Sequence, residues 1–346
     1  MEPTTEQKGR GTMNGKPVFE VAAKTIINTK SGFAKKLLCD GMTFSTGDAC
    51  VYECAFCYVP SMFQKLERVA ELKHAHGLSH GEMVVRRGNA LAILESELVH
   101  KSGKPKYPDA NDRRVIYASP SVDVAGNIDL AWETAEACKL ILRHTAWHIR
   151  LLSKSNLLHR VGAMLLNDGF SARAKERMIF GVSTGTLDDQ LAKVFERKTP
   201  LVSARLKSLH WLQDAGFRTF GMLCPSLPQR NGEEYVKFSK AAMAAIRAER
   251  CEHVWAEVIN VRGDSMVATV KALYDGGFRE QASLLAEVQN SSLAWHTYNH
   301  YTFHAHVSAM QEIGINHREK LRYLTYTTSE TQSYWEACRS NGAVLL

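Results

Sequence analysis

Three of the eight cysteines lie within eight residues, in the segment GDACVYECAFCY (47–58). Their spacing is Cys50-x3-Cys54-x2-Cys57. A short loop with this spacing can wrap three thiolates around one face of a cubane cluster. Three protein ligands on a four-iron cluster leave one iron open to bind and activate a substrate or cofactor. These residues therefore indicate a [4Fe–4S] centre.

Two other interpretations of the cysteines stay open on spacing alone. A structural zinc site usually has four ligands, arranged in two well-separated Cys-x2-Cys knuckles. The sequence has no second knuckle, although Cys39 or a distant histidine could provide the fourth ligand. The remaining interpretation is a chance cluster of buried cysteines. The spacing favours iron–sulfur over both.

A second group of chemically capable side chains lies near the C-terminus, in WHTYNHYTFHAH (295–306). His296, His300 and His304 recur every four residues, so they share one face if the segment is helical, with Tyr298 and Tyr301 interleaved. Such a face could hold a metal ion, stack nucleic-acid bases or pack against the protein. We expect packing or substrate contact, because the sequence shows nothing that would constrain three histidines around a metal.

The elements that must position these residues alternate between β-rich runs and amphipathic stretches. Crossover helices between strands imply a parallel sheet, and function then lies at the carboxyl ends of the strands. About six units suit either a doubly wound sheet or an incomplete (β/α)6 TIM-like barrel. We predict the barrel, an α/β fold, with a C-terminal extension rich in His and Tyr. Strands are expected at 42–47, 113–119, 148–154, 177–184, 217–223 and 253–261.

Composition excludes several classes of protein. Hydrophobic residues make up 45% and charged residues 23% of the chain, which is ordinary for a globular protein. No apolar run approaches the ~20 residues that cross a bilayer, and the polar N-terminus lacks the apolar core of a secretion signal. We therefore expect a cytoplasmic protein without a membrane partner, whose cysteines do not form a disulfide framework.

Charge marks the first domain boundary. The net charge is +7, and residues 1–38 carry seven bases against three acids. This excess predicts a basic flexible leader that could follow a polyanion, with a solvated tail as an equally good interpretation. Residues 39–265 are then the partial barrel, and residues 266–346 are the C-terminal extension packed on it.

The cysteine segment resembles the radical S-adenosylmethionine superfamily, whose motif is Cys-x3-Cys-x-aromatic-Cys after the first strand of a (β/α) protein. Phe56 is the aromatic residue here. The Cys57-Tyr58 pair resembles the Cys-Tyr that the spore photoproduct lyase-like (DNA repair photolyase-like) branch commonly has at this place. The resemblance covers about residues 40–262. Five further segments agree with that branch in order and spacing: YASPSVD (117–123), LLSKSNLLHR (151–160), GVSTGTLDD (181–189), ARLKSLHWLQDAG (204–216) and FGMLCPSLP (220–228).

The resemblance implies a radical enzyme with a [4Fe–4S] cluster, held by Cys50, Cys54 and Cys57, and S-adenosyl-L-methionine (SAM). In that superfamily the open iron chelates SAM, whose reductive cleavage releases a 5′-deoxyadenosyl radical that abstracts hydrogen from the substrate. Cofactors carry such chemistry, while the protein binds, orients and excludes water.

The matching positions also imply cofactor contacts. Phe56 would border the adenine, and Lys154 suits the methionine carboxylate through a charge-assisted hydrogen bond. Serine and threonine at strand ends are also frequent helix caps. The other candidates lie near the methionine amino group (Ser119, Ser121, Asp123), beside Lys154 (Ser153, Ser155) and near the ribose (Ser183, Thr184).

The sequence departs from the branch at one place. The lyase that repairs spore photoproduct uses a cysteine near the second strand end as hydrogen donor, and here no cysteine lies between residues 113 and 137. Spore photoproduct lyase activity itself is therefore doubtful. Cys224, at a later strand end, could reach the same cavity, although a lone cysteine is more often a small buried hydrophobe. Cys224 and Tyr58 are the candidate catalytic residues.

The resemblance suggests DNA or RNA as the substrate and an electron donor such as flavodoxin or ferredoxin as a partner. The alternative function is a zinc- or cluster-stabilised nucleic-acid-binding protein that uses the basic leader without radical catalysis. Colour would separate the two, because an iron–sulfur protein purified without oxygen is brown.

Overall fold

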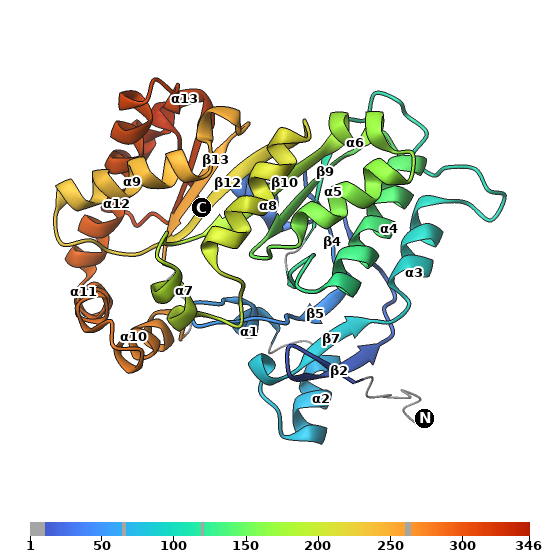
Figure 1. Ribbon diagram of the computed structural model, residues 1–346, viewed down its shortest axis with the longest axis horizontal. Helices are drawn as coiled ribbons and strands as arrows, with labels where there is room; N and C mark the ends of the chain where they lie inside the picture. The colour runs from blue at the N-terminus through green and yellow to red at the C-terminus, as the bar shows by residue number, and fades with distance from the viewer. Residues whose placement is uncertain (1–10, 64–66, 119–120, 260–263) are drawn as a thin grey trace. The chain divides into compact units, whose positions relative to one another are not determined.

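The computed structural model describes residues 11–63, 67–118, 121–259 and 264–346 (Figure 1). Contacts divide the chain into two compact units. The first consists of residues 1–34, 38–53 and 59–180, and the second of residues 35–37, 54–58 and 181–346. Both units combine parallel strands with helices, which confirms the predicted α/β class.

A small mixed sheet in the first unit supports the cysteine segment. Its strands run in the order β1 (Thr12–Met13), β2 (Lys16–Val21), β7 (Val84–Arg87) and β5 (Gly47–Ala49). β2 is parallel to β7, and β5 is antiparallel to β7. Apolar side chains of this sheet form a core with α2 (Glu67–His76), which includes Phe19, Val21, Val69, Leu72 and Val85.

The expectation of a flexible leader over residues 1–38 is wrong for most of its length. Besides β1 and β2, these residues form β3 (Ile27–Asn28) and the 3-10 helix η1 (Gly32–Lys36). The excess of bases suggested a solvated chain, but Val18, Phe19 and Val21 are buried and Lys16 is only 1% exposed. Burial of this apolar surface offsets the entropy of ordering the segment.

The second sheet of the first unit carries the parallel strands that the sequence predicted. β4 (Met42–Phe44), β8 (Val115–Ala118) and β9 (His148–Ser153) are parallel neighbours, and β3 adds to β4 in the antiparallel sense. The Asn127 side chain caps α4 by accepting from the Leu130 amide, so the helix begins at a defined residue. The helices around these strands are α3 (Ala90–Leu98), α4 (Ile128–His144), α5 (Leu158–Asn167) and α6 (Ser171–Arg177).

The division between the units falls within β10 (Met178–Thr184), and the second unit continues from there. β12 (Arg218–Ser226), β13 (Val254–Val258), β14 (Leu321–Thr325) and β15 (Ala343–Leu345) follow as successive parallel neighbours. The residues beyond 266 therefore add two parallel strands, so the predicted count of six strand–helix units is not confirmed.

Helices of the second unit pack in neighbouring pairs. α9 (Gly232–Ala245) lies along α12 (Ser292–Glu312), and α10 (Ser265–Asp275) packs on α11 (Arg279–Asn290) (Figure 1). No helix within the described ranges is both long and apolar enough to cross a membrane. The remaining elements of the chain are β6 (Glu53–Cys54), α1 (Val59–Phe63), η2 (His80–Glu82), α7 (Asp189–Phe195), β11 (Glu196–Arg197), α8 (Val202–Asp214), η3 (Ala248–Arg250), α13 (His317–Lys320), α14 (Gln332–Ala337) and η4 (Cys338–Asn341).

Candidate active site

The cysteine segment begins in β5, where the backbone at Gly47 packs closely against β7. A Cβ atom at Gly47 would lie 2.7 Å from the Val85 carbonyl oxygen, so the two strands approach as closely as they do only because this residue is glycine. The next side chain, Asp48, is fully buried and accepts from Arg87 Nη2 at 2.7 Å. Arg87 also donates to the Ser45 carbonyl at 3.0 Å. Buried charge and backbone contact together fix the chain two residues before Cys50.

Lys16 of β2 binds the next part of the loop, residues 50–53. Its ammonium nitrogen lies 2.9 Å from the Tyr52 carbonyl oxygen and 3.4 Å from that of Cys50. The Glu53 carboxylate lies 3.5 Å away. The residue between the two carbonyls, Val51, packs against Gly126, where any Cβ would overlap the valine side chain. Strand β2 and the turn before α4 thus both shape the loop.

The second half of the loop belongs to the other unit and packs on α7. The Cys57 amide donates to the Cys54 carbonyl at 3.1 Å, which closes a tight turn, and the Ala55 amide donates to the Phe195 carbonyl at 2.8 Å. The Phe56 ring lies 5.6 Å from that of Phe195. Phe56, expected to border an adenine, therefore has an aromatic neighbour of the protein's own.

The three loop thiols differ in environment from most of the other cysteines. Cys50, Cys54 and Cys57 are half-buried, whereas Cys39, Cys138, Cys251 and Cys338 are buried, and no cysteine forms a disulfide. Burial raises the pKa of Cys251 to about 12, and that of Cys138 still further. Thiols with raised pKa values are poor ligands, because metals bind the thiolate.

The donor set suits a [4Fe–4S] cluster in number and kind, since three accessible thiols leave one iron without a protein ligand. Within the described ranges, however, no three His, Cys, Asp or Glu side chains already converge as a metal site.

Polar side chains at the strand ends of the first unit form two connected groups. Ser121 Oγ lies 2.8 Å from Ser45 Oγ, and it donates to the Gly47 carbonyl at 3.0 Å. Asp123, which is 8% exposed, accepts from Ser153 Oγ at 2.7 Å and from the Lys154 amide at 2.8 Å. Asp123 thus joins the ends of two neighbouring strands.

The structure therefore brings Asp123, Ser153 and Lys154 together, as the sequence suggested, with Ser155 next to them. Ser155 Oγ accepts from the Leu157 amide at 2.9 Å, which is a capping contact. Ser119, the remaining candidate at these strand ends, lies outside the described residues.

The strand ends of the second unit carry a separate group. Ser183 Oγ donates to the Cys224 carbonyl at 3.3 Å, and Thr184 Oγ1 donates to the Thr186 carbonyl. Both hydroxyls thus have backbone acceptors. The Ser183 carbonyl accepts from Arg205 at 3.2 Å, and Arg205 forms a fully buried ion pair with Glu196 at 2.5 Å.

Lys36, Cys224 and Glu257 meet at the carboxyl ends of β12 and β13. Lys36 Nζ lies 3.0 and 3.1 Å from the two Glu257 carboxylate oxygens, and Cys224 Sγ lies 3.9 Å from Oε2. Burial by itself lowers the pKa of Lys36, but the Glu257 carboxylate, helped by Tyr326 and Cys224, raises it above its ordinary value. The Trp255 indole donates to the Lys36 carbonyl at 2.8 Å and fixes the segment that carries the lysine.

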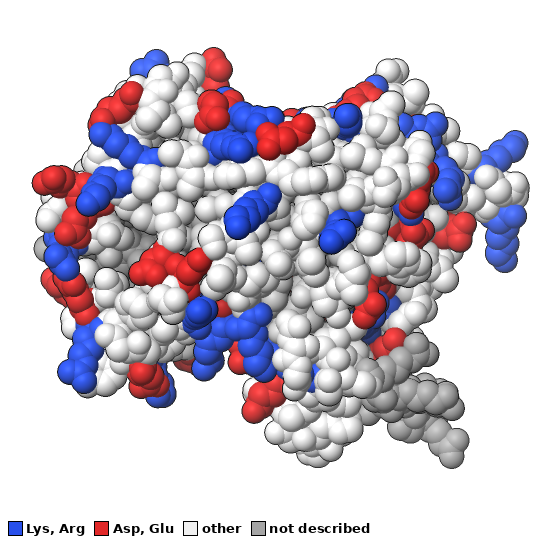
Figure 2. Space-filling model, in the orientation of Figure 1, with Lys and Arg blue, Asp and Glu red and all other residues white. Residues whose placement is uncertain are grey.

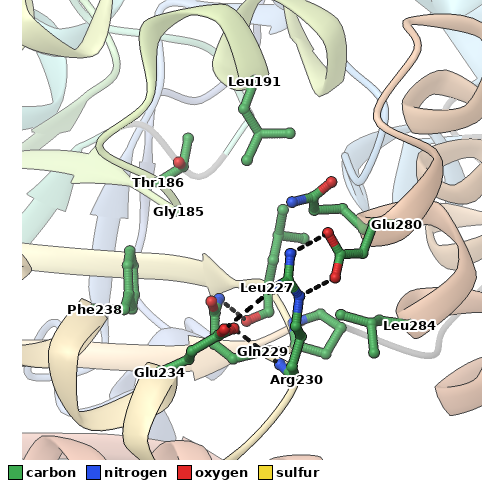
Figure 3. Close-up of a pocket in the computed structure, with 12 residues that line it drawn as sticks. Gly185, Thr186, Leu191, Leu227, Gln229, Arg230, Glu234, Phe238, Glu280 and Leu284 are labelled. Carbon is green, nitrogen blue, oxygen red and sulfur yellow. Dashed lines mark hydrogen bonds and ion pairs between the residues drawn. The ribbon is translucent and has the colours of Figure 1, made fainter.

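A cavity of about 130 Å³ opens in the same unit beyond the ends of β10 and β12 (Figure 3). Leu191, Leu227, Phe238 and Leu284 give it apolar walls. Arg230 reaches Glu280 of α11 and pairs with Glu234 of α9, so charged side chains span one side of it (Figure 3). Its place at strand ends is where a parallel sheet binds small molecules.

The His/Tyr-rich segment is α12, and two of its histidines, His300 and His304, lie side by side with ring centroids 4.4 Å apart. Tyr298 is buried, donates to the Ser226 carbonyl and accepts from the Ile259 amide, so it ties the helix to the strand ends. His304 Nε2 lies 2.7 Å from the Tyr334 hydroxyl, and His300 stacks on the same ring at 5.1 Å. His300 and His304 therefore both pack on Tyr334.

Comparisons with known proteins were made on the whole chain. No protein-family model matches it, and no curated protein matches it. Among solved structures, a point mutant of spore photoproduct lyase superposes with a TM-score of 0.50 and 13% sequence identity, covering 74% of this chain and 66% of that one. Another mutant of the lyase, with bound AdoMet and dinucleoside spore photoproduct, gives 0.50 and 12% over the same shares.

The chain has the fold of spore photoproduct lyase. The resemblance suggested by the cysteine spacing is thus confirmed in the fold, and the chain spans 66% of the lyase's length. The radical S-adenosylmethionine methyltransferase TsrM from Kitasatospora setae, with tryptophan and a SAM analogue bound, is also similar, at a TM-score of 0.37 and 13% identity over 62% of this chain and 35% of that one.

Sequence reasoning missed two lysines of the site. Lys16 and Lys36 were counted among the bases of a leader, and nothing local distinguishes them from solvated lysines. The apolar alternation around Lys16 in KPVFEV is the one signal that could have placed it in a strand. Lys36 gives no such signal, because its partner Glu257 lies 221 residues further along the chain.

Proposed function

We propose that the protein is a radical SAM enzyme, lyase-like in its relationships, that reductively cleaves S-adenosyl-L-methionine at a [4Fe–4S] cluster. The observation that carries the proposal is the loop Cys50–Cys57, whose three thiols are half-buried and lie in a chain with the fold of spore photoproduct lyase. Cys50, Cys54 and Cys57 would hold the cluster. When bound and reduced, the cluster would supply the electron that converts SAM into methionine and a 5′-deoxyadenosyl radical.

The chain's own residues would bind and orient the cofactor. Lys154 has its amide held by Asp123, which fixes the backbone at this strand end, and its ammonium would donate to the methionine carboxylate. Ser121 and Asp123, with Ser119, would receive the methionine amino group, and Ser153 and Ser155 shape the turn. Phe56 would border the adenine, and Ser183 and Thr184 would face the ribose.

Cys224 is the proposed hydrogen donor to a substrate-derived radical, with Tyr58 as a second candidate. Its thiol lies 3.9 Å from Glu257, whose charge Lys36 balances, at the end of the sheet where substrates bind. The ion pair would hold the Glu257 carboxylate beside the thiol. Exclusion of water from around Cys224, Lys36 and Glu257 would protect a substrate radical from side reactions.

We further propose a nucleic-acid component as the substrate class, with flavodoxin or ferredoxin as the electron donor. A solved lyase mutant with the same fold has a dinucleoside lesion bound. On the face shown in Figure 2, Lys and Arg alternate with Asp and Glu, so the net charge of +7 is spread rather than gathered there.

The decisive experiment is anaerobic reconstitution with iron and sulfide, followed by reduction in the presence of SAM. We expect a brown protein with about four irons per chain, and release of 5′-deoxyadenosine and methionine that candidate nucleotides accelerate. A colourless protein that holds one zinc per chain would instead establish the nucleic-acid-binding alternative. Fluorescence anisotropy with labelled oligonucleotides over a salt series would then measure that binding.

A further inference from the structure

Lys16 is an ammonium group in an unusual place. Its side chain is 1% exposed, although lysine is almost never fully buried unless it is paired. Removing such a charge from water is expensive, so its contacts must compensate for the loss of hydration. Its ammonium donates to the Tyr52 and Cys50 carbonyls and forms an ion pair with Glu53. Each of these partners belongs to the cysteine loop.

Another buried lysine of the same unit shows what a purely structural role looks like. Lys139 in α4 is 9% exposed and pairs with Glu136 on its own helix and with Asp168 after α5. Its partners are carboxylates that join two helices. Lys16 instead takes backbone carbonyls on both sides of Val51, which sets the direction of the chain between Cys50 and Cys54.

We infer that Lys16 is a positioning residue for the iron–sulfur cluster, an inference that rests on the function proposed above. Its ammonium orders the loop so that Cys50 and Cys54 can ligate together, as outer-shell partners do in other metal sites. Its positive charge beside the loop also favours the more negative, reduced state of the cluster. Net charge near a cluster is one of the factors that set its reduction potential.

Two substitutions separate these effects. Lys16→Met removes the charge and the donors, whereas Lys16→Gln removes the charge but keeps an N–H donor for one carbonyl. Lys139→Met is the matched control, because it removes a comparably buried lysine away from the loop. Iron and sulfide content, the rate of iron release to a chelator and the midpoint potential are measured on anaerobically reconstituted protein.

Lys16→Met should bind the cluster about 10- to 100-fold less tightly than wild type, the range for loss of an outer-shell partner, and should release iron correspondingly faster. The rate of iron release from Lys16→Gln should lie between the rates of wild type and Lys16→Met. The midpoint potential of the cluster in Lys16→Gln should be more negative than in wild type. Lys139→Met should match wild type in both quantities. Unchanged iron release and unchanged midpoint potential in Lys16→Gln and Lys16→Met would overturn the inference. Iron release from Lys139→Met as fast as from Lys16→Met would also overturn it.

A cluster-free measurement keeps this test apart from the proposed function. In the iron-free protein, alkylation of Cys50, read by mass spectrometry, should be faster in Lys16→Met than in wild type and unchanged in Lys139→Met. If wild type takes up no iron, the proposed function fails, and equal alkylation rates would then also remove the loop-ordering role. Should circular dichroism show that Lys16→Met does not fold, Lys16→Gln decides the outcome.

Discussion

Buried charges in this chain are paired, and two of the three pairs below join segments that are far apart in sequence. Asp48 pairs with Arg87, Glu196 with Arg205, and Lys36 with Glu257. A buried pair of this kind contributes little net stability, because desolvation offsets the attraction, but losing one partner leaves an uncompensated charge. At the scale of single residues, we therefore expect that replacing one member of such a pair destabilises the protein more than replacing both.

The ligand assignment predicts a clear division among the cysteines. Cys50→Ala, Cys54→Ala and Cys57→Ala should each lose the cluster, because each removes one of only three protein thiolates. Cys138→Ala, buried within α4, should keep about four irons per chain. Iron and sulfide analysis after anaerobic reconstitution measures this. A full cluster in any of the three loop variants, or its loss in Cys138→Ala, would contradict the assignment.

The Lys36–Glu257 pair predicts a non-additive effect on the free energy of unfolding. Lys36→Met should cost roughly 2–3 kcal/mol, because it leaves a carboxylate that is only 9% exposed without its counter-charge. Adding Glu257→Gln should recover most of that loss, which urea denaturation of the double-mutant cycle measures. Arg113→Met, from a pair that is half exposed on both sides, is the control and should cost under about 1 kcal/mol.

The same pair makes a prediction about alkaline pH. The pKa of Lys36 is raised in the folded protein above its ordinary 10.5. The contribution of the pair is therefore fully present below pH 10.5 and is lost as the pH rises through the raised value. The stability difference between wild type and the double variant should shrink over that range, and a difference independent of pH would count against the ion pair.

At the scale of elements, the sequence predicted best where periodicity was strong. β8, β9, β10, β12 and β13 were expected within a few residues of where they lie. β7 was missed because it is only four residues long and is followed almost at once by α3. β14 and β15 were missed because each is short and is recognised as a strand only through its neighbour in the sheet.

The site was predictable where its residues are neighbours in sequence. The three cysteines were predictable from their spacing. Asp123, Ser153 and Lys154 were predictable from their places at strand ends. The contacts that organise them were not predictable, because Lys16 and Gly126 act on the loop only after folding brings them beside it. A side chain's role as a support depends on tertiary contacts that local patterns do not encode.

Gly126 predicts a steric test of how elements shape the loop. A methyl group at Gly126 would overlap Val51, so Gly126→Ala should destabilise the protein by roughly 1–3 kcal/mol and speed alkylation of Cys50. Val51→Ala in the same chain should relieve the overlap and restore both quantities toward wild type. Gly32→Ala, where a Cβ meets nothing within 4 Å, is the control. Failure of the double variant to recover would argue against direct contact.

At the scale of the whole molecule, one histidine predicts sensitivity to acid. His306 is 0% exposed, and neither ring nitrogen has a hydrogen-bond partner within the described part of the chain. Burial lowers the pKa of His306 from 6.5 to about 4. As the pH falls below 6.5, the unfolded chain takes up a proton that the folded chain cannot, so folding stability decreases until about pH 4.

This effect is measurable as a slope of unfolding free energy against pH. Between pH 7.5 and 4.5, wild type should lose roughly 2–3 kcal/mol through His306. His306→Gln should reduce that loss whatever its stability at pH 7.5, and His74→Gln, at an exposed position, should leave it unchanged. Chemical denaturation at several pH values decides the matter, and parallel curves for wild type and His306→Gln would exclude the histidine as the cause.

The ion pair between Lys36 and Glu257 also has a consequence in time. Its two residues are 221 positions apart, and residues 35–37 belong to the second unit although the chain on either side belongs to the first. At a synthesis rate of about 5–20 residues per second, the carboxylate leaves the ribosome roughly 10–45 s after the lysine. For that interval Lys36 lacks the group that will neutralise it. The nascent chain must therefore wait until its last third is synthesised before Lys36 and Glu257 can pair at the ends of β12 and β13.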